Sequence, residues 1–364
     1  MFGIGKNSFL GIDVGTSTVK AVEIKVKNKK PVLSNYAWID LDAFSGKKEK
    51  LPDLENIWPA YLKKLIKESK IKSRNAYVSI PAFGGLITLI EFPEMSKGEL
   101  DQAIKFEAHK YIPTSLDDIV LSWDIVGMKG ETKLPADGNS SAGGQKIPPA
   151  KKVQVLLVAA PKTRVVKSEK LIKDIGLDLK SIEIESFAMV RSLVGNDQGN
   201  FVIADIGARV CNIALVEKGI IKVNRNIDAG GREITKTIAR SFDIDEERAE
   251  EMKISGRNFL EKETKITFPS LENITGEIKR VLSAYYKNDQ GIRVDGIILS
   301  GGTANLKGLE NYFSNALQIK TTIGNPLGRI EYDKKLDPKL VSLRPKFSVA
   351  VGLALKGVEE YLKK

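Results

Sequence analysis

The chain has 364 residues, 42% of them hydrophobic and 28% charged, a composition typical of globular proteins. Because single hydrophobic cores rarely grow beyond roughly 250–300 residues, this length predicts two lobes. One cysteine, Cys211, excludes an internal disulfide framework, and its apolar strand-like surroundings favour a packing role. The first residues lack the apolar core of a signal peptide, and no uninterrupted apolar run could span a membrane, so we expect a cytoplasmic protein.

The net charge of +11 comes mainly from scattered lysines. Solvated surface is the simplest interpretation, and proximity to an anionic membrane is the second. Because no zinc-finger spacing, helix-turn-helix signature or RNP-like aromatic pattern accompanies the lysines, we expect no nucleic-acid partner.

The N-terminal 80 residues are predicted to form strands and one helix. Apolar and alternating patterns indicate strands over 9–13 and 19–26, with a turn between them. Helical spacing over 60–69 follows Pro59, which we expect to open the helix. A further strand is predicted over 75–80.

Residues 81–182 are predicted to form a small module of their own in the order β-α-β-β-α. Ser96 and Glu99 have the spacing of a capping box, which places a helix after the first strand. The only histidine, His109, falls near the end of this helix, where we expect it to be exposed. Gly176 is expected to end the last helix. Residues 128–152 are rich in Gly, Pro, Ser and Lys and predict a long mobile loop between two strands.

The opening pattern repeats from residue 200. Strands are predicted over 201–206 and 211–216, helices over 246–253 and 271–287, and an apolar strand over 296–300. Strands that alternate with helices in this way indicate α/β layers.

Two Asp-x-Gly turns, at Asp13 and Asp205, end apolar strands in matched positions. Each turn exposes backbone N–H groups that can hold an anion, and glycine lets the backbone approach closely. A single turn of this kind is most often only structural, whereas two in matched contexts favour nucleotide binding. Both aspartates are candidates to face Mg²⁺ through water. Residues of the two turns that could contact phosphate are Asp13, Gly15, Thr16, Ser17, Thr18, Lys20, Asp205 and Gly207.

A third element is the strand that runs into Gly301-Gly302. Paired glycines at the start of a helix let the backbone lie flat against a nucleoside, and Asn305 lies in the same segment. An ordinary αβ turn is the alternative interpretation. The sequence has no complete Walker A loop and no GxGxxG after a strand, which disfavours P-loop and dinucleotide folds.

These three motifs resemble those of a known superfamily. Residues 10–24, 203–219 and 297–308 are similar to the phosphate-1, phosphate-2 and adenosine motifs of actin, hexokinase and DnaK-type chaperones, and 347–357 resembles the helix that closes such folds. Within the superfamily, Phe92-Pro93-Glu94-Met95 and the segment 228–235 (DAGGREIT) resemble the type IV pilus assembly family PilM, itself similar to FtsA.

The resemblance implies an α/β, actin-like (ribonuclease H-like) fold of two duplicated lobes, with an inserted subdomain of the FtsA 1C type (SHS2-like). The implied order is 1–80 for the first half of lobe 1, 81–182 for the inserted partner-binding subdomain with its loop 128–152, 183–199 for the return to lobe 1, 200–227 with 273–330 for lobe 2, 228–272 for subdomain 2B, and 331–364 for the final return to lobe 1.

The resemblance also implies site roles. Gly230 and Gly231 would line the cleft, and Glu250 and Lys253 would hold the nucleoside, although a Glu and a Lys on a charged helix are as often only solvated. Asp205 is the candidate catalytic residue. The phosphate-2 loop departs from the common pattern at Arg209 and at Val210, which has no hydroxyl, so ATP binding is expected to survive better than hydrolysis.

The implied function is an ATP- and Mg²⁺-binding cytoplasmic scaffold. Its implied partner is the N-terminal cytoplasmic peptide of the inner-membrane protein PilN, with the pilus motor ATPase and self-association as further candidates. The alternatives are an FtsA-like cell-division protein, from which the chain differs by ending soon after the closing helix, and a small-molecule kinase of the same superfamily.

Overall fold

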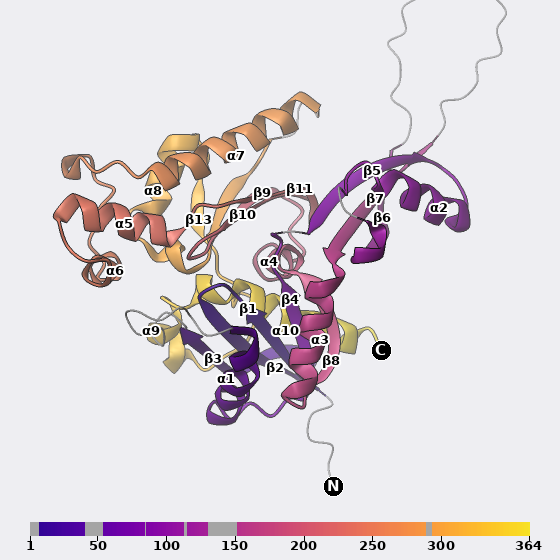
Figure 1. Ribbon diagram of the computed structural model, residues 1–364, viewed down its shortest axis with the longest axis horizontal. Coiled ribbons are helices and arrows are strands. Elements are labelled where there is room, and N and C mark those ends of the chain that lie inside the picture. The colour runs from indigo at the N-terminus through magenta and orange to yellow at the C-terminus, as the bar shows by residue number, and fades with distance from the viewer. Residues whose placement is uncertain (1–6, 41–53, 84, 113–114, 130–150, 289–292) are drawn as a thin grey trace, which may run out of the picture. The chain divides into compact units, whose positions relative to one another are not determined.

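The computed structural model describes residues 7–40, 54–83, 85–112, 115–129, 151–288 and 293–364. They form two compact units, a larger one from Met1–Phe83 with Thr163–Lys364 and a smaller one from Gly84–Lys162. The larger unit contains two five-stranded sheets and the smaller unit one three-stranded sheet (Figure 1).

The first lobe is built on a sheet of order β3-β2-β1-β4-β8. Its strands are β1 (Ser8–Val14), β2 (Thr18–Lys27), β3 (Lys30–Asp40), β4 (Asn75–Ile80) and β8 (Asp178–Ile184). β2 runs antiparallel to both β1 and β3, whereas β4 runs parallel to β1 and β8 parallel to β4.

Helices α1 (Leu54–Glu68) and α3 (Lys162–Asp174) pack on one face of this sheet. Leu62 of α1 and Ile172 of α3 belong to the same buried cluster as Leu10 and Ile12 of β1. The expectation that Pro59 opens the first helix is wrong, because the helix begins at Leu54 and contains the proline. The apolar face of α1, packed on the sheet, therefore outweighs the local preference of proline for a first turn.

The opposite face of the sheet is covered by α4 (Glu185–Leu193) and α10 (Ser348–Leu362). α10 comes so close to β1 that a methyl group at Gly11 would lie far inside van der Waals distance of the Ala350 carbonyl oxygen. Elsewhere on α10, a methyl group at Gly352 would clash in the same way with the backbone of Ala188 in α4. The glycines thus allow three backbones to pack directly against one another.

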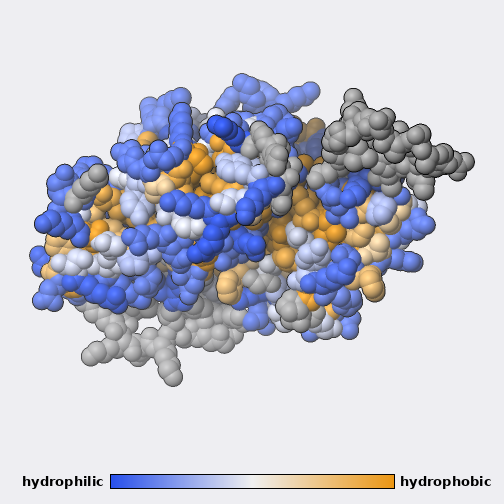
Figure 2. Space-filling view, turned by 90° about the horizontal axis from the view of Figure 1, so that it is seen from above, coloured by the Kyte–Doolittle hydropathy of each residue, from blue (hydrophilic) through white to orange (hydrophobic). Residues whose placement is uncertain are grey.

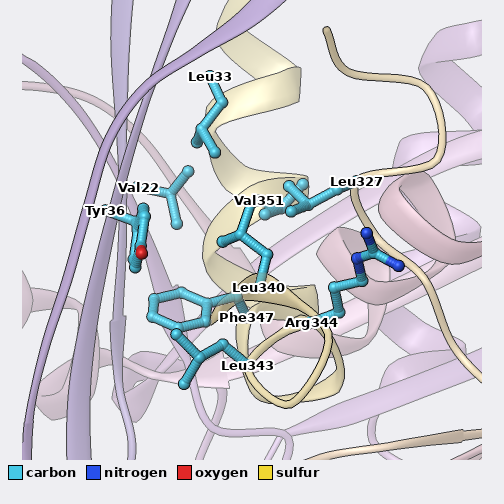
Figure 3. Close-up of a pocket in the computed structure, with 9 residues that line it drawn as sticks. All are labelled: Val22, Leu33, Tyr36, Leu327, Leu340, Leu343, Arg344, Phe347 and Val351. Atoms are coloured by element: carbon cyan, nitrogen blue, oxygen red, sulfur yellow. The ribbon is translucent and has the colours of Figure 1, made fainter. Parts of the chain in front are cut away.

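The C-terminal part of the chain returns to the first lobe through α9 (Asp337–Leu340) and two short 3₁₀ turns, Lys334–Leu336 and Arg344–Phe347. The Phe347 ring meets Tyr36 and Trp38 of β3 edge-on, with centroids 5.9 and 6.1 Å apart. A small apolar pocket remains between this segment and the sheet (Figure 3), lined by Val22, Leu33, Tyr36, Leu327, Leu340, Leu343, Arg344, Phe347 and Val351.

The second lobe repeats the architecture of the first, with sheet order β11-β10-β9-β12-β13. Its strands are β9 (Asn200–Ile206), β10 (Cys211–Glu217), β11 (Ile220–Ile227), β12 (Gly296–Ser300) and β13 (Thr321–Ile323). Its helices are α5 (Gly231–Phe242), α6 (Glu246–Ile254), α7 (Pro269–Asn288) and α8 (Leu309–Leu317), with 3₁₀ turns at Lys262–Thr264 and Gly302–Asn305. The antiparallel strands β9, β10 and β11 correspond to β1, β2 and β3, and β12, which is parallel to β9, corresponds to β4. This correspondence confirms the predicted duplicated fold.

The smaller unit is an antiparallel sheet of order β5-β7-β6 that packs on one helix. Its elements are β5 (Leu86–Pro93), α2 (Lys97–Ala108), a 3₁₀ turn (Leu116–Asp118), β6 (Ile119–Lys129) and β7 (Lys152–Pro161). The capping box of Ser96 and Glu99 is confirmed by both of its hydrogen bonds, and His109 is exposed as predicted.

This unit is shorter than the 81–182 module proposed from the sequence. Ile172 and Ile175 of α3 pack in the core of the first lobe, and β8 pairs with β4 of the first sheet. The predicted loop 128–152 overlaps both strands at its ends, since β6 continues to Lys129 and β7 begins at Lys152; its centre, 130–150, lies outside the described residues.

Figure 2 shows a mostly hydrophilic face, with hydrophobic side chains visible between charged ones. In the part of the chain that the structure describes, no helix is long and apolar enough to cross a membrane.

One buried carboxylate ties together four segments of the first lobe. Glu23 of β2 is fully buried and accepts hydrogen bonds from the Ser8 hydroxyl at 2.9 Å and the Asn35 amide at 2.8 Å. It also accepts the backbone N–H groups of Lys72 and Ser73, at 3.1 and 2.8 Å. Burial alone would raise the pKa of Glu23, but these hydrogen bonds outweigh it and hold the pKa below its ordinary value.

We expect Glu23→Gln to lower the free energy of unfolding by about 1–3 kcal/mol at neutral pH, because a charged acceptor is replaced and one donor is left unpaired. Since the pKa of Glu23 is lower in the folded protein, this contribution is complete above about pH 4.3 and is lost as the pH falls below that value. Denaturant unfolding at neutral and acidic pH would measure it. Glu68→Gln, at an exposed position of α1, is the matched control, and equal stability of the two variants would contradict the prediction.

Candidate functional site

The two Asp-x-Gly turns have the same hydrogen-bonded geometry. The Gly15 N–H donates to the Thr18 carbonyl at 3.0 Å, and the Gly207 N–H donates to the Val210 carbonyl at the same distance. Asp13 pairs across its sheet with Lys20, and Asp205 pairs with Asn212, seven residues later in both cases. The duplication therefore places both aspartates at equivalent points of the two sheets.

In the first turn, Asp13 forms an ion pair with a lysine of the next strand. Lys20 Nζ lies 2.9 Å from Asp13 Oδ2, and the Ser79 hydroxyl donates to Asp13 Oδ1 at 3.1 Å. Burial would lower the pKa of Lys20, but the charge of Asp13, the hydrogen bond to it, and the charges of Asp205 and Glu185 raise it instead. Lys20 is thus a fixed positive charge beside the loop, as an anion site requires.

A carboxylate that the sequence analysis did not single out, Glu185, belongs to the same cluster. It starts α4 directly after β8 and accepts the Ala82 N–H at 3.2 Å and the Asn212 side-chain amide at 3.3 Å. Burial raises the pKa of Glu185 to about 7, with Asp205 and Asp13 adding to the effect. An acidic residue at the carboxyl end of a parallel strand was the available signal in the sequence.

Asp205 is partly buried. Burial raises its pKa above the ordinary value, partly opposed by a hydrogen bond with Ser300 and by Lys20. Both lobes thus contribute to one group of interacting charges, formed by Asp13, Lys20, Glu185 and Asp205. A carboxylate whose pKa lies near 7, such as Glu185, can accept a proton from water at neutral pH.

The start of α5 closes onto the second turn. The Gly231 and Arg232 N–H groups donate to the carbonyls of Gly207 and Ala208, both at 2.9 Å, and no side chain would fit at Gly230 beside the same carbonyls. The Arg232 guanidinium also reaches the first turn and donates to the Ser17 hydroxyl at 3.2 Å. Arg232 thus links the two loops.

The charged helix α6 contributes Glu250 and Lys253. Lys253 Nζ donates to the Gly231 carbonyl at 3.1 Å, to the Thr235 hydroxyl at 2.8 Å and to Glu250 at 2.6 Å. Burial lowers the pKa of Lys253, Glu250 opposes this, and Lys346 adds to it. The lysine therefore fixes α6 to the start of α5, a structural role that the sequence did not indicate.

The strand–Gly-Gly element meets the same region. Gly301 has a φ of +85° and approaches the backbone of Ile206 too closely for any side chain, so glycine is required there. A Cβ atom added at Gly302 would lie 3.8 Å from the aliphatic part of Lys346 and within 4 Å of no other residue, so this position faces open space. The Thr303 hydroxyl donates to the Gly207 carbonyl at 3.3 Å, which connects this element to the second turn.

The remaining sequence candidates have different surroundings. Thr16 is exposed on the first turn, and Thr18 begins β2 and contributes its carbonyl to the turn. The Asn305 amide donates to the Ser342 carbonyl at 2.7 Å, so its side chain anchors the C-terminal segment. Arg209 is exposed, and Cys211 is buried with its pKa raised well above the ordinary value by burial, which agrees with a packing role.

The arrangement fits a nucleotide with a hydrated cation. Glycine-lined loops with free space at Gly302 suit phosphates and a nucleoside, and Lys20 supplies positive charge. Among the described residues no cluster of three or more His, Cys, Asp or Glu side chains is placed to hold a metal ion. Mg²⁺ requires no such cluster, because it keeps several waters and binds through one or two carboxylates together with phosphate, roles available to Asp13 and Asp205.

Comparison with known proteins agrees with this geometry. Residues 11–358 match the family described as type IV pilus assembly protein PilM. The chain belongs to the PilM family. A solved PilM–PilN type IV pilus biogenesis complex is similar with a TM-score of 0.76 and 25% identity, covering 96% of this chain and 98% of that one.

More distant relatives share the fold. MreB5 of Spiroplasma citri, solved with AMPPNP bound, is similar with a TM-score of 0.54 and 15% identity over 98% of both chains. The cell division protein FtsA of Helicobacter pylori strain J99 is 23% identical over 239 residues, 56% of this chain and 47% of FtsA. The chain thus spans about half the length of the curated relatives that it matches.

We expect Glu185→Gln to raise the melting temperature above pH 7. Since the pKa of Glu185 is about 7 in the folded protein and about 4.3 in an unfolded chain, wild-type stability falls as the pH rises between these values. The amide keeps an acceptor for Ala82 and Asn212 but does not titrate, so the variant should show a flatter pH profile. Thermal melting from pH 4.5 to about 8 tests this, with the exposed Glu169→Gln as control; a lower melting temperature above pH 7 would contradict it.

Proposed function

We propose that this chain is a cytoplasmic scaffold of the type IV pilus inner-membrane platform that binds Mg-ATP between its duplicated loops. The observation that carries the nucleotide part is the group formed by Asp13, Lys20, Asp205 and Glu185 beside two glycine turns of the same hydrogen-bonded geometry. Membership of the PilM family supports the role in pilus assembly. The nucleotide-bound relative MreB5 has the same fold, which supports a ligand of the ATP type.

In this proposal, different residues contact the phosphates, the metal ion and the nucleoside. Lys20 and N–H groups of the two turns other than those of Gly15 and Gly207 would bind phosphate oxygens, and Asp13 and Asp205 would orient the waters of Mg²⁺. The backbone at Gly302, with the Lys346 side chain close to it, would lie beside the nucleoside. Asp13→Ala should weaken binding, because Lys20 and the metal waters both lose their carboxylate partner.

Turnover is expected to be slow. The second turn has Val210, without a hydroxyl, and a scaffold requires occupancy of the site rather than rapid hydrolysis. Glu185 joins Asp205 as a candidate to take a proton from water, because the pKa of Glu185 lies close to neutral pH.

The partner in this proposal is the N-terminal cytoplasmic peptide of a PilN-like membrane protein, which would bring the scaffold to the inner membrane. The similar solved structure is a complex of PilM with PilN, and its match covers nearly all of this chain. The pilus motor ATPase and a second copy of the chain are further candidates. The match to FtsA supports the cell-division alternative, but it covers only about half of each chain.

The smaller unit offers a place for an extended peptide. β6 is an edge strand of its sheet, and exposed apolar side chains follow it: Val120 is 41% exposed, Ile125 44% and Met128 69%. An added strand could pair with backbone groups of this edge, with the apolar side chains selecting the sequence.

We expect Gly302→Val to weaken Mg-ATP binding at least about tenfold while the fold is kept. A Cβ added at Gly302 lies 3.8 Å from the Lys346 side chain and within 4 Å of no other residue, so the position itself leaves room for a substitution. Calorimetry with ATP and magnesium measures the affinity, and Gly276→Val, where a side chain likewise meets open space, is the control. Absence of ATP binding in the wild-type protein, or equal affinity in both variants, would refute the nucleotide proposal.

We expect the double variant Val120→Lys, Ile125→Lys to lose about tenfold or more in affinity for a synthetic peptide of the partner's first residues. Lysines on the edge strand repel an incoming apolar strand and discourage edge pairing. Fluorescence anisotropy with labelled peptide measures the affinity, and ATP affinity should stay unchanged. A double variant on exposed positions of α7, Lys279→Gln with Arg280→Gln, is the control, and equal peptide affinity in all proteins would place the binding surface elsewhere.

A further inference from the structure

One end of the first sheet carries a concentration of lysine. Three segments meet there: the β2–β3 turn (27–30), the end of α1 with its connection to β4 (67–74), and the end of α3 with its connection to β8 (170–178). Because β4 and β8 run parallel to β1, and β2 antiparallel to it, all three lie where β1 begins, at the opposite end from Asp13.

Hydrogen bonds make these segments parts of one surface. The Arg74 guanidinium donates to the Gly176 carbonyl at 2.7 Å, and the Asp178 N–H donates to the Arg74 carbonyl at 2.8 Å. Glu23 of β2 accepts the N–H groups of Lys72 and Ser73, which fixes the middle segment to the strand that leads into the β2–β3 turn. We call this surface the lysine end.

Positive charge at the lysine end is largely uncompensated. Its 21 residues contain nine basic side chains against three acidic ones, so it holds more than half of the chain's net charge of +11. Within the described residues, the ion pairs found there join Lys30 to Glu331 at 2.9 Å and Glu68 to Lys64 at 3.9 Å. The exposed basic residues are Lys27, Lys29, Lys30, Lys67, Lys70, Lys72, Arg74, Lys170 and Lys173.

The residue types of the lysine end favour an anionic lipid surface over a nucleic acid as its binding partner. The three segments contain no aromatic residue on which a base could stack, and their single arginine already donates to Gly176. Lysine is a flexible point charge, which suits many weak contacts with lipid phosphates better than the geometric recognition of one group. Clusters of 4–8 basic residues beside a membrane are the usual pattern of anionic-lipid contact.

We propose that the lysine end rests on the anionic phospholipid headgroups of a bilayer. This inference builds on the proposed recruitment by a membrane partner, because the peptide would supply specificity and the lysines would set which end of the first lobe faces the lipid. Each basic residue near such a surface strengthens binding about fivefold, so several together give measurable binding without inserted side chains.

The test is co-sedimentation of the full chain with vesicles, without any partner peptide. We expect binding to vesicles of phosphatidylcholine with phosphatidylglycerol, none to phosphatidylcholine alone, and release at about 1 M salt, where the Debye length falls to about 3 Å. The triple variant Lys27→Gln, Lys72→Gln, Lys173→Gln, with one change in each segment, should bind about 100-fold more weakly. Its melting temperature and ATP affinity should be unchanged, since all three side chains are exposed.

The matched control removes three exposed lysines from the second lobe, Lys279→Gln, Lys307→Gln, Lys320→Gln, and should bind lipid within about twofold of wild type. Equal loss in the two triple variants, no sedimentation of the wild-type protein with anionic vesicles, or tighter binding of the lysine end to duplex DNA would overturn the lipid contact. Peptide and ATP binding measured on the same proteins report separately on the proposed scaffold function.

Discussion

Direct backbone contact between α10, β1 and α4 is the constraint on which the larger unit depends. Gly11 and Gly352 leave no room for side chains at the two contacts, so the position of α10 fixes that of α4. α4 in turn begins with Glu185 and continues with Ser186, whose hydroxyl accepts from the Asn212 amide at 3.0 Å and donates to Asn224 at 2.8 Å in the second lobe. α4 therefore connects the packed backbones of the first lobe to the charged residues of the site.

The two halves share a backbone but differ in chemistry. At equivalent registers, Asp13 faces a lysine and Asp205 faces an asparagine. The first half thus holds a compensated pair, whereas in the second half the nearby amide binds Glu185. Duplication supplies two matched turns, and the residue opposite the aspartate, Lys20 in one half and Asn212 in the other, gives each turn its own partner.

Charge is also separated along the first sheet. Its carboxyl end carries Asp13 and borders Glu185 and Asp205, while its opposite end exposes lysines around a buried carboxylate, Glu23. β1 is paired on both sides within the sheet, and it connects the two ends directly. The acidic group and the lysine end therefore lie at opposite ends of one sheet.

The sequence by itself determined the duplicated fold, the paired turns at Asp13 and Asp205, and the strand–Gly-Gly element, because hydrophobic periodicity and glycine placement are local signals. Only the tertiary structure assigned α3 and β8 to the first lobe, since a helix pattern does not say which core receives its apolar face. It also brought Glu185 to the site and gave Lys253 and Asn305 structural partners. These roles rest on hydrogen bonds between residues far apart in the chain, and no spacing in the sequence encodes such distances.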